Sequence, residues 1–421
     1  MPQISTLENG VRILTEYIPH VRSASIGVWI AVGSRDEPED VSGISHFIEH
    51  VLFKGTERRT AKEIAEALDA VGGQLNAFTT KEYTCYHAKV LDEYFPLAVD
   101  ILTDMLFFSC FNQDDIEREK NVIVEEIKMY EDAPDELVHD VLASTLWQGH
   151  ALGRPIIGHV DVVQRLLRDD LRYFYGRHYR TGRRVVIAAA GNIDHARVVS
   201  ILSPVFADLS GTARERELKT PVGHGSFICR NKETEQVHLC LGTQGLALDH
   251  ECIYQLQVLN TILGGGISSR LFQRIREDLG LVYSIYSYHS AYRDTGVFAI
   301  YAGLSAANVD RVLDLICAEI EDIRTRGITS EELKRSQDQL KGNFLLSLES
   351  VNARMSRLGK YELYLGRVPS PEEVVARVQA VTVEEVRDLA RRLLRPEKMC
   401  LAAIGPWTGE DGWHAALGRL K

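Results

Sequence analysis

The sequence contains no Cys-x-x-Cys pair and no even set of cysteines that would suggest a disulfide framework. Its seven cysteines are scattered over the chain, at Cys85, Cys110, Cys229, Cys240, Cys252, Cys317 and Cys400. An odd and scattered set is typical of reduced thiols in a cytoplasmic protein, and it makes these residues poor candidates for a metal site. We therefore expect the cysteines to be buried and reduced.

Long apolar runs and an excess of basic residues are also missing. No stretch of 18 apolar residues occurs, which argues against a membrane span. The first ten residues lack the basic and apolar regions of a signal peptide, so we expect a cytoplasmic protein. The formal net charge of −11 argues against nucleic acid as the main partner. It would suit basic or extended peptides, although mild acidity is also simply a solubility feature.

The length of 421 residues exceeds what one ordinary core serves, so we predict two domains. A composition of 45% hydrophobic and 25% charged residues is that of a globular protein. A charged, turn-rich segment supplies the best linker, at residues 213–224. The predicted N-terminal domain is therefore 1–212 and the C-terminal domain 225–421.

The stretch from Ser45 to Val51 reads as a helix that carries two histidines and a glutamate on one face. His46 and His50 lie one turn apart, and Glu49 falls on the same side. Two imidazoles and one carboxylate from elsewhere form a common catalytic zinc set, which leaves Glu49 free to act as a general base. The alternative is a histidine pair satisfied by carbonyls and water, with Glu49 as a solvated charge.

A long acidic helix from near Gln113 to Tyr130 contains the candidates for a third ligand. Its predicted buried stripe comprises Val122, Ile123, Ile127 and Tyr130. Glu119 and Glu126 lie seven residues apart and therefore share a face two turns from each other. Spacing alone does not choose among the four candidates on this helix, Glu117, Glu119, Glu125 and Glu126.

The two halves of the chain repeat one order of elements. In the first half we expect strands at 11–17, 22–32, 74–80, 83–90 and 184–193, and helices at 61–70, 93–108, 135–147 and 160–178. In the second we expect strands at 236–242, 282–290 and 296–303, and helices at 250–262, 306–326 and 330–350. This order predicts a duplicated α+β unit, each copy a mostly antiparallel sheet with helices packed on it.

The second copy lacks the metal set. It has no His-x-x-Glu-His, and in the aligned register Ser336 and Asn343 take the places of Glu119 and Glu126. A duplication in which one copy has lost every ligand indicates that the set in the first copy is an added function.

These residues together resemble the pitrilysin family of zinc peptidases, whose inverted motif is His-x-x-Glu-His. Within that family the chain is similar to short bacterial members related to the mitochondrial processing peptidase β subunit. The resemblance covers nearly the whole chain, and it is carried by His46–His50, Gly72–Ala77, Glu119–Glu126, Ser269–Phe272 and Arg276–Tyr283.

The resemblance implies one zinc ion per chain, with His46, His50 and Glu126 as its ligands. It also implies that Glu49 is the general base and that Glu119 supports the ligands from outside the first coordination shell.

The same resemblance implies how substrate is held. The strand around Asn76, Ala77 and Phe78 would pair with an extended peptide by strand addition. Arg276 and Tyr283 would hold the substrate and the reaction centre, since a guanidinium binds a peptide carbonyl and a phenol donates to a developing oxyanion. From their residue types alone, Arg276 in a surface ion pair and Tyr283 in the core are the alternatives.

The sequence therefore predicts a zinc-dependent endopeptidase that acts on extended peptides or unfolded polypeptide segments inside a closed chamber. Resemblance implies a homodimer. The alternatives are a catalytic subunit that needs a different partner chain, and a non-catalytic scaffold.

Overall fold

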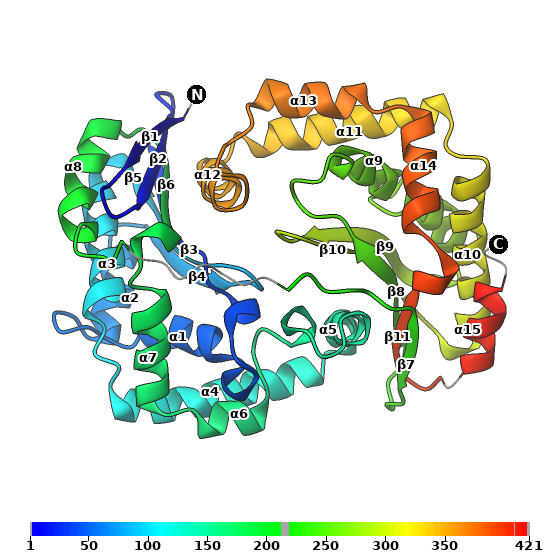
Figure 1. The fold of residues 1–421 in the computed structure, drawn as a ribbon, viewed down its shortest axis with the longest axis horizontal. Coiled ribbons are helices and arrows are strands. Elements are labelled where there is room, and N and C mark those ends of the chain that lie inside the picture. Colours follow the sequence, from blue (N-terminus) through cyan, green and yellow to red (C-terminus); the bar gives the residue numbers. More distant parts are fainter. Residues whose placement is uncertain (1, 212–218, 408, 419–421) are drawn as a thin grey trace. The chain divides into compact units, whose positions relative to one another are not determined.

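A computed structural model describes residues 2–211, 219–407 and 409–418, which form two compact units (Figure 1). Of these residues, the first unit contains those up to 128, 154–211 and 345–370, and the second contains the rest. Each unit thus includes a segment from the other side of the predicted boundary. The predicted linker lies outside the described residues up to 218, and 219–224 form neither helix nor strand.

The first unit is built on a six-stranded sheet with the order β1-β2-β6-β3-β5-β4. Only β2 and β6 run parallel, and the other pairs in this sheet are antiparallel. Apolar residues from end to end of β6 suit a central strand that is buried on both faces. The strands are β1 (Gln3–Thr6), β2 (Arg12–Tyr17), β3 (Ser23–Ile30), β4 (Gln74–Thr79), β5 (Thr84–Leu91) and β6 (Val185–Gly191).

Helices cover both faces of this sheet. One face carries the larger apolar core, with residues from α1, α3, α4 and α8, and α12 packs on the other face against β3 and β6. Thr60 caps α2, since its side chain accepts from Glu63 N–H while the Glu63 carboxylate accepts from Thr60 N–H. The helices are α1 (Ile44–Leu52), α2 (Ala61–Asp69), α3 (Phe95–Phe108), α4 (Gln113–Glu131), α6 (Val160–Arg165), α7 (Arg168–His178), α8 (His195–Phe206) and α12 (Val351–Leu365).

Among the described residues, the second unit repeats this sheet without an equivalent of β1. Its order is β7-β11-β8-β10-β9, again with the first two strands parallel and the remaining pairs antiparallel. The predicted duplication of a mostly antiparallel α+β unit is therefore confirmed. The strands are β7 (Ser226–Arg230), β8 (Val237–Gly245), β9 (Val282–Ala291), β10 (Gly296–Leu304) and β11 (Cys400–Ile404).

Each sheet receives one helix from the opposite half of the chain. The helix α5 (Pro134–Leu146) follows α4 yet packs on β8 and β11, whereas α12 follows α11 (Ser330–Ser347) yet packs on β3 and β6 (Figure 1). The other helices of the second unit are α9 (Ile253–Leu263), a π-helical segment (Phe272–Asp278), α10 (Val309–Thr325), α11 (Ser330–Ser347), α13 (Pro371–Ala380), α14 (Val383–Leu393) and α15 (Glu410–Leu417).

Three predictions of local structure were wrong. The helix expected over 160–178 is two helices, because the chain is extended at Leu166 and Leu167. The stripe of α4 includes Ile123 and Ile127, but the side chain of Val122 is 48% exposed because it lies one residue off that face. Cys110 is exposed rather than buried.

Two further findings concern the cysteines and membrane spans. No disulfide links the seven cysteines, all of which the structure describes. Within the described ranges, no helix combines the length and apolar character needed to cross a bilayer.

Candidate metal centre

The helix α1 presents His46, Glu49 and His50 on one side. The centroids of the two imidazole rings are 4.7 Å apart. The helix starts from Gly43, whose φ of 97° suits glycine, and the carboxylate of Glu37 accepts the backbone N–H groups of Gly43 (2.7 Å) and Ser45 (2.8 Å). Burial raises the pKa of Glu37 to about 7, although these donors act to lower it. Glu37 thus fixes the first turn of the metal-site helix.

Glu126 on α4 faces both imidazoles. Its Oε1 lies 3.8 Å from Nε2 of His46, and its Oε2 lies 3.6 Å from Nε2 of His50. One donor atom from each of the three residues can be chosen so that all lie within 4.8 Å of one another. Tetrahedral zinc ligands are about 3.4 Å apart, so the donor atoms would have to approach one another by up to about 1.4 Å to bind one ion. The side chain of Glu126 is 45% exposed, which leaves the group open to solvent.

The other exposed glutamates of α4 do not join this group. Glu125 pairs with Lys128 and Glu117 pairs with Lys120, both through exposed carboxylates on the helix surface. Within the described chain, His46, His50 and Glu126 are the group that could hold a metal ion. The geometry therefore distinguishes Glu126 from its neighbours, as spacing could not.

Glu119 contacts His50 at Nδ1, the ring nitrogen that does not face Glu126. Its Oε2 lies 3.1 Å from Nδ1 of His50, and Lys54 Nζ lies 2.8 Å from its Oε1. Although burial acts to raise the pKa of Glu119, the hydrogen bonds from His50 and Lys54 lower it. An ionised Glu119 favours the His50 tautomer with a proton on Nδ1, which directs the lone pair of Nε2 toward Glu126.

His46 is held in its neutral form. Burial, with a contribution from His50, lowers the pKa of His46 to about 3. Its Nδ1 is buried, and no hydrogen-bond partner for this atom occurs among the described residues. A neutral imidazole with Nε2 facing a carboxylate is the form that ligates a metal, so the donor set fits a zinc ion.

Glu49 stands outside the donor group and is held by the sheet. Its Oε2 accepts a hydrogen bond from Thr79 Oγ1 at 2.6 Å. Burial raises the pKa of Glu49 and so does the charge of Glu126, while Thr79 and His50 act to lower it. A carboxylate with a raised pKa beside a metal-binding group is suited to accept and return a proton.

The strand predicted to bind substrate is β4, which forms one edge of the first sheet and pairs only with β5 among the described strands. Asn76 is exposed, and its Oδ1 accepts the N–H of Ala77 at 2.8 Å. Ala77 belongs to the larger core, whereas the ring of Phe78 packs with Trp29 on the opposite face. The unpaired edge of β4 is therefore compatible with strand addition.

Arg276 and Tyr283 belong to the second unit. The guanidinium of Arg276 lies over the ring of Phe272, 4.7 Å from its centroid. Tyr283 is 75% exposed, at an irregularity in the pairing of β9 with β10, so it is not a core residue.

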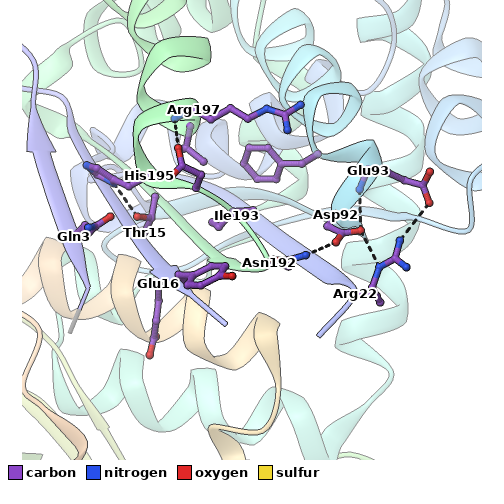
Figure 2. A pocket seen from close by; sticks show the side chains of 14 residues that line it. Gln3, Thr15, Glu16, Arg22, Asp92, Glu93, Asn192, Ile193, His195 and Arg197 are labelled. Atoms are coloured by element: carbon purple, nitrogen blue, oxygen red, sulfur yellow. Dashed lines mark hydrogen bonds and ion pairs between the residues drawn. The ribbon is translucent and has the colours of Figure 1, made fainter. Parts of the chain in front are cut away.

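A cavity of about 930 Å³ lies elsewhere in the first unit, at the carboxyl ends of β2 and β6 (Figure 2). Several of its polar groups bond one another: Asp92 accepts from Arg22 and Asn192, and His195 bonds Thr15. None of the three residues of the donor group lines this cavity.

Sequence reasoning missed Glu37, Lys54 and Thr79. Of the three, only Thr79 could have been found from the sequence, because alternation along the strand places its side chain on the same face as Ala77, two residues earlier. The contacts of Glu37 and Lys54 depend on how distant segments pack.

Family models match both halves of the chain. The model described as Insulinase (Peptidase family M16) matches residues 12–160, and the model described as Peptidase M16 inactive domain matches residues 165–340. The Bacillus subtilis protein named uncharacterized zinc protease YmxG is 49% identical over 401 residues, 95% of this chain and 97% of its own length. The chain belongs to peptidase family M16. This confirms the resemblance, and the description of the second M16 model agrees with the missing motif in that half.

A further relative and two solved structures are similar to this chain over nearly its whole length. Uncharacterized zinc protease SCO5738 of Streptomyces coelicolor is 45% identical over 415 residues, 96% of this chain and 89% of its own. The crystal structure of a peptidase M16 inactive domain from Pseudomonas fluorescens has a TM-score of 0.90 at 22% identity and covers 96% of this chain and 98% of that one. A protease from Helicobacter pylori has a TM-score of 0.88 at 21% identity, covering 96% and 99%. These two structures share the fold.

Proposed function

We propose that the protein is a zinc-dependent endopeptidase that hydrolyses extended peptides or unfolded polypeptide segments. One observation carries the proposal: His46, His50 and Glu126 converge on one point while Glu49, a fourth polar group on the same side, is tied to the sheet. In this proposal the three converging residues hold one zinc ion per chain.

In the proposed reaction, the protein's residues bind the metal ion, transfer the proton and orient a ligand. A zinc ion bound at this donor set would supply a Lewis acid and an acidified water. Glu49 takes the proton of the attacking water and then delivers it to the leaving amine. Glu119, backed by Lys54, keeps His50 in the tautomer that can ligate.

Substrate binding in this proposal uses main-chain hydrogen bonds. An extended peptide adds to the free edge of β4 beside Asn76, Ala77 and Phe78, which gives affinity with limited sequence selectivity. Arg276 and Tyr283 act on the bound peptide, the first by binding a carbonyl and the second by donating to the developing oxyanion. Their roles rest on the family resemblance, as does cleavage within the closed chamber of a homodimer. The proposed cytoplasmic location rests on the odd and scattered set of cysteines.

Two alternatives make different predictions. A non-catalytic scaffold has no need of a complete donor group, so the intact set of three favours an enzyme. A subunit that requires a different partner chain would be inactive when pure. Size-exclusion chromatography with light scattering gives the oligomeric state of the pure protein, and cleavage of a quenched peptide gives its activity. An active homodimer would contradict both alternatives.

The test of the proposal is the Glu49→Gln variant. It should retain one zinc per chain by elemental analysis, because Glu49 is outside the donor set, and lose roughly 10²- to 10⁴-fold in kcat on a quenched extended peptide. Glu125→Gln, an exposed glutamate that pairs with Lys128, is the matched control and should keep full activity. Cleavage by the Glu49 variant at the wild-type rate would remove Glu49 from the role of base.

A further inference from the structure

Thr79 belongs both to the proposed substrate strand and to the surroundings of the proposed base. It is the last residue of β4, and its side chain lies on the face of the sheet that packs against α1. Alternation along the strand places Ala77 on that face too, whereas Phe78 packs on the opposite face with Trp29. Thr79 is thus the member of β4 that reaches the metal-site helix.

The contact between Thr79 and Glu49 is short. Thr79 Oγ1 donates to Glu49 Oε2 at 2.6 Å. A glutamate side chain has three rotatable bonds, so a carboxylate without fixed donors samples many positions. A hydrogen bond to an ionised acceptor is among the stronger ones, and the bond from Thr79 restrains the carboxylate of Glu49.

Thr79 itself has a fixed place in the hairpin. It pairs with Thr84 across β4 and β5, and the two hydroxyl oxygens are 3.5 Å apart. Thr84 is buried and donates to the carbonyl of Val32, at 3.0 Å, beyond the end of β3. The position of the Thr79 hydroxyl therefore follows from the sheet and not from the flexible side chains around it.

We propose that Thr79 is a positioning residue, whose hydroxyl holds the carboxylate of Glu49 in register with a peptide bound on β4. The inference rests on the proposed peptidase function and adds to it a direct link between the substrate strand and the base. Peptide and base are then positioned by the same strand, so the hydroxyl acts on the rate of the chemical step and not on affinity.

Substitution of the hydroxyl by a methyl group isolates this role. Thr79→Val keeps the shape, the strand preference and the backbone N–H, and it removes only the hydroxyl donor. In the zinc-loaded enzyme we expect kcat on a quenched extended peptide to fall roughly 10- to 100-fold, with KM changed by less than about twofold. Thr79→Ser keeps the donor and should recover most of kcat. Zinc content and melting temperature should stay close to wild type in both.

Two further measurements keep the test decisive. Thr79→Ala also lacks the donor but adds no apolar methyl beside Glu49, so an equal loss in the Ala and Val variants assigns the effect to the hydroxyl, even if one of them folds poorly. In a Glu49→Gln background, which should cleave roughly 10²- to 10⁴-fold more slowly, the affinity for a fluorescent peptide should be the same with Thr79 or Val.

The outcomes separate this inference from the function on which it rests. Wild-type kcat in Thr79→Val, equal losses in the Val and Ser variants, or a change confined to KM would each overturn the positioning role while the peptidase stands. A zinc-loaded wild-type protein that cleaves no better than Glu49→Gln would overturn the proposed function and this inference together.

Discussion

The two imidazoles of the donor group are held by different means. His50 is oriented by Glu119, whose carboxylate contacts Nδ1 of His50 and is itself paired with the ammonium group of Lys54. His46 is held by burial, which also keeps it neutral. One imidazole is thus oriented by its carboxylate partner, while the other is fixed by packing. Glu126, half-exposed, is the member of the group with the most freedom to adjust when a metal ion binds.

The choice of Glu126 as ligand gives a prediction at the residue scale. Glu126→Gln replaces a carboxylate by an amide that ligates zinc poorly, so zinc affinity should fall by more than the 10- to 100-fold typical of losing an outer-shell partner. Glu125→Gln should bind zinc as wild type does, because that carboxylate pairs with Lys128 on the helix surface. Competition against a chromogenic chelator measures both affinities. A larger loss in the Glu125 variant would show that the wrong carboxylate was chosen.

The site could be predicted only in part from the sequence. The spacing of His46, Glu49 and His50 was sufficient, because helix geometry fixes which residues share a face. Four glutamates on α4 remained open, since the rotation of that helix is set by the packing of Ile123 and Ile127 and not by its acidic residues. The family resemblance, not spacing, pointed to Glu126.

Among the elements, α12 lies against the first sheet where both partners carry glycine. A Cβ on Gly359 would lie 2.3 Å from the ring of Trp29, and one on Gly27 would lie 2.7 Å from Sδ of Met355. Trp29 thus packs against Gly359 and Met355 against Gly27, and the two glycines let the helix and the sheet approach closely. The large apolar side chains on either side then fill the space between helix and sheet.

This close contact predicts the effect of one added methyl group. Gly359→Ala should destabilise the protein by about 1–3 kcal/mol, because the indole of Trp29 is buried and cannot move aside freely. Gly176→Ala on α7 is the matched control: nothing lies within 4 Å of its added Cβ, and alanine there should stabilise by up to about 1 kcal/mol. Urea unfolding of both variants measures these changes. Equal stability of the two would mean that α12 does not pack closely on the sheet.

At the scale of the whole molecule, the duplication includes an exchange of helices. The helix that follows α4 covers the second sheet, and the helix that follows α11 covers the first. The repeat of sheet order could be predicted from the order of strands and helices along the chain. The exchange could not, because an apolar stripe on α12 does not indicate which of two similar apolar sheet faces it covers.

The exchange predicts that the N-terminal half of the sequence does not fold as a separate domain. Residues 1–212 alone would leave the second face of the first sheet uncovered, with Trp29, Leu14 and Val186 exposed to water. We expect this fragment to aggregate or to bind a hydrophobic dye, and to unfold without a cooperative transition. Addition of residues 345–370 through a long Gly/Ser linker should restore a cooperative transition and zinc binding, since α12 then covers that face.

A charge on the covering helix provides the control for this fusion. Leu358→Asp places a carboxylate in the buried contact between α12 and the sheet, so the fused protein should behave like the bare fragment. Thermal unfolding followed by circular dichroism, with zinc content measured on the same samples, distinguishes the three proteins. If the bare fragment unfolds cooperatively at the temperature of the fusion, the helix contributed by the second half is dispensable. The two units would then be independent domains divided near residue 212.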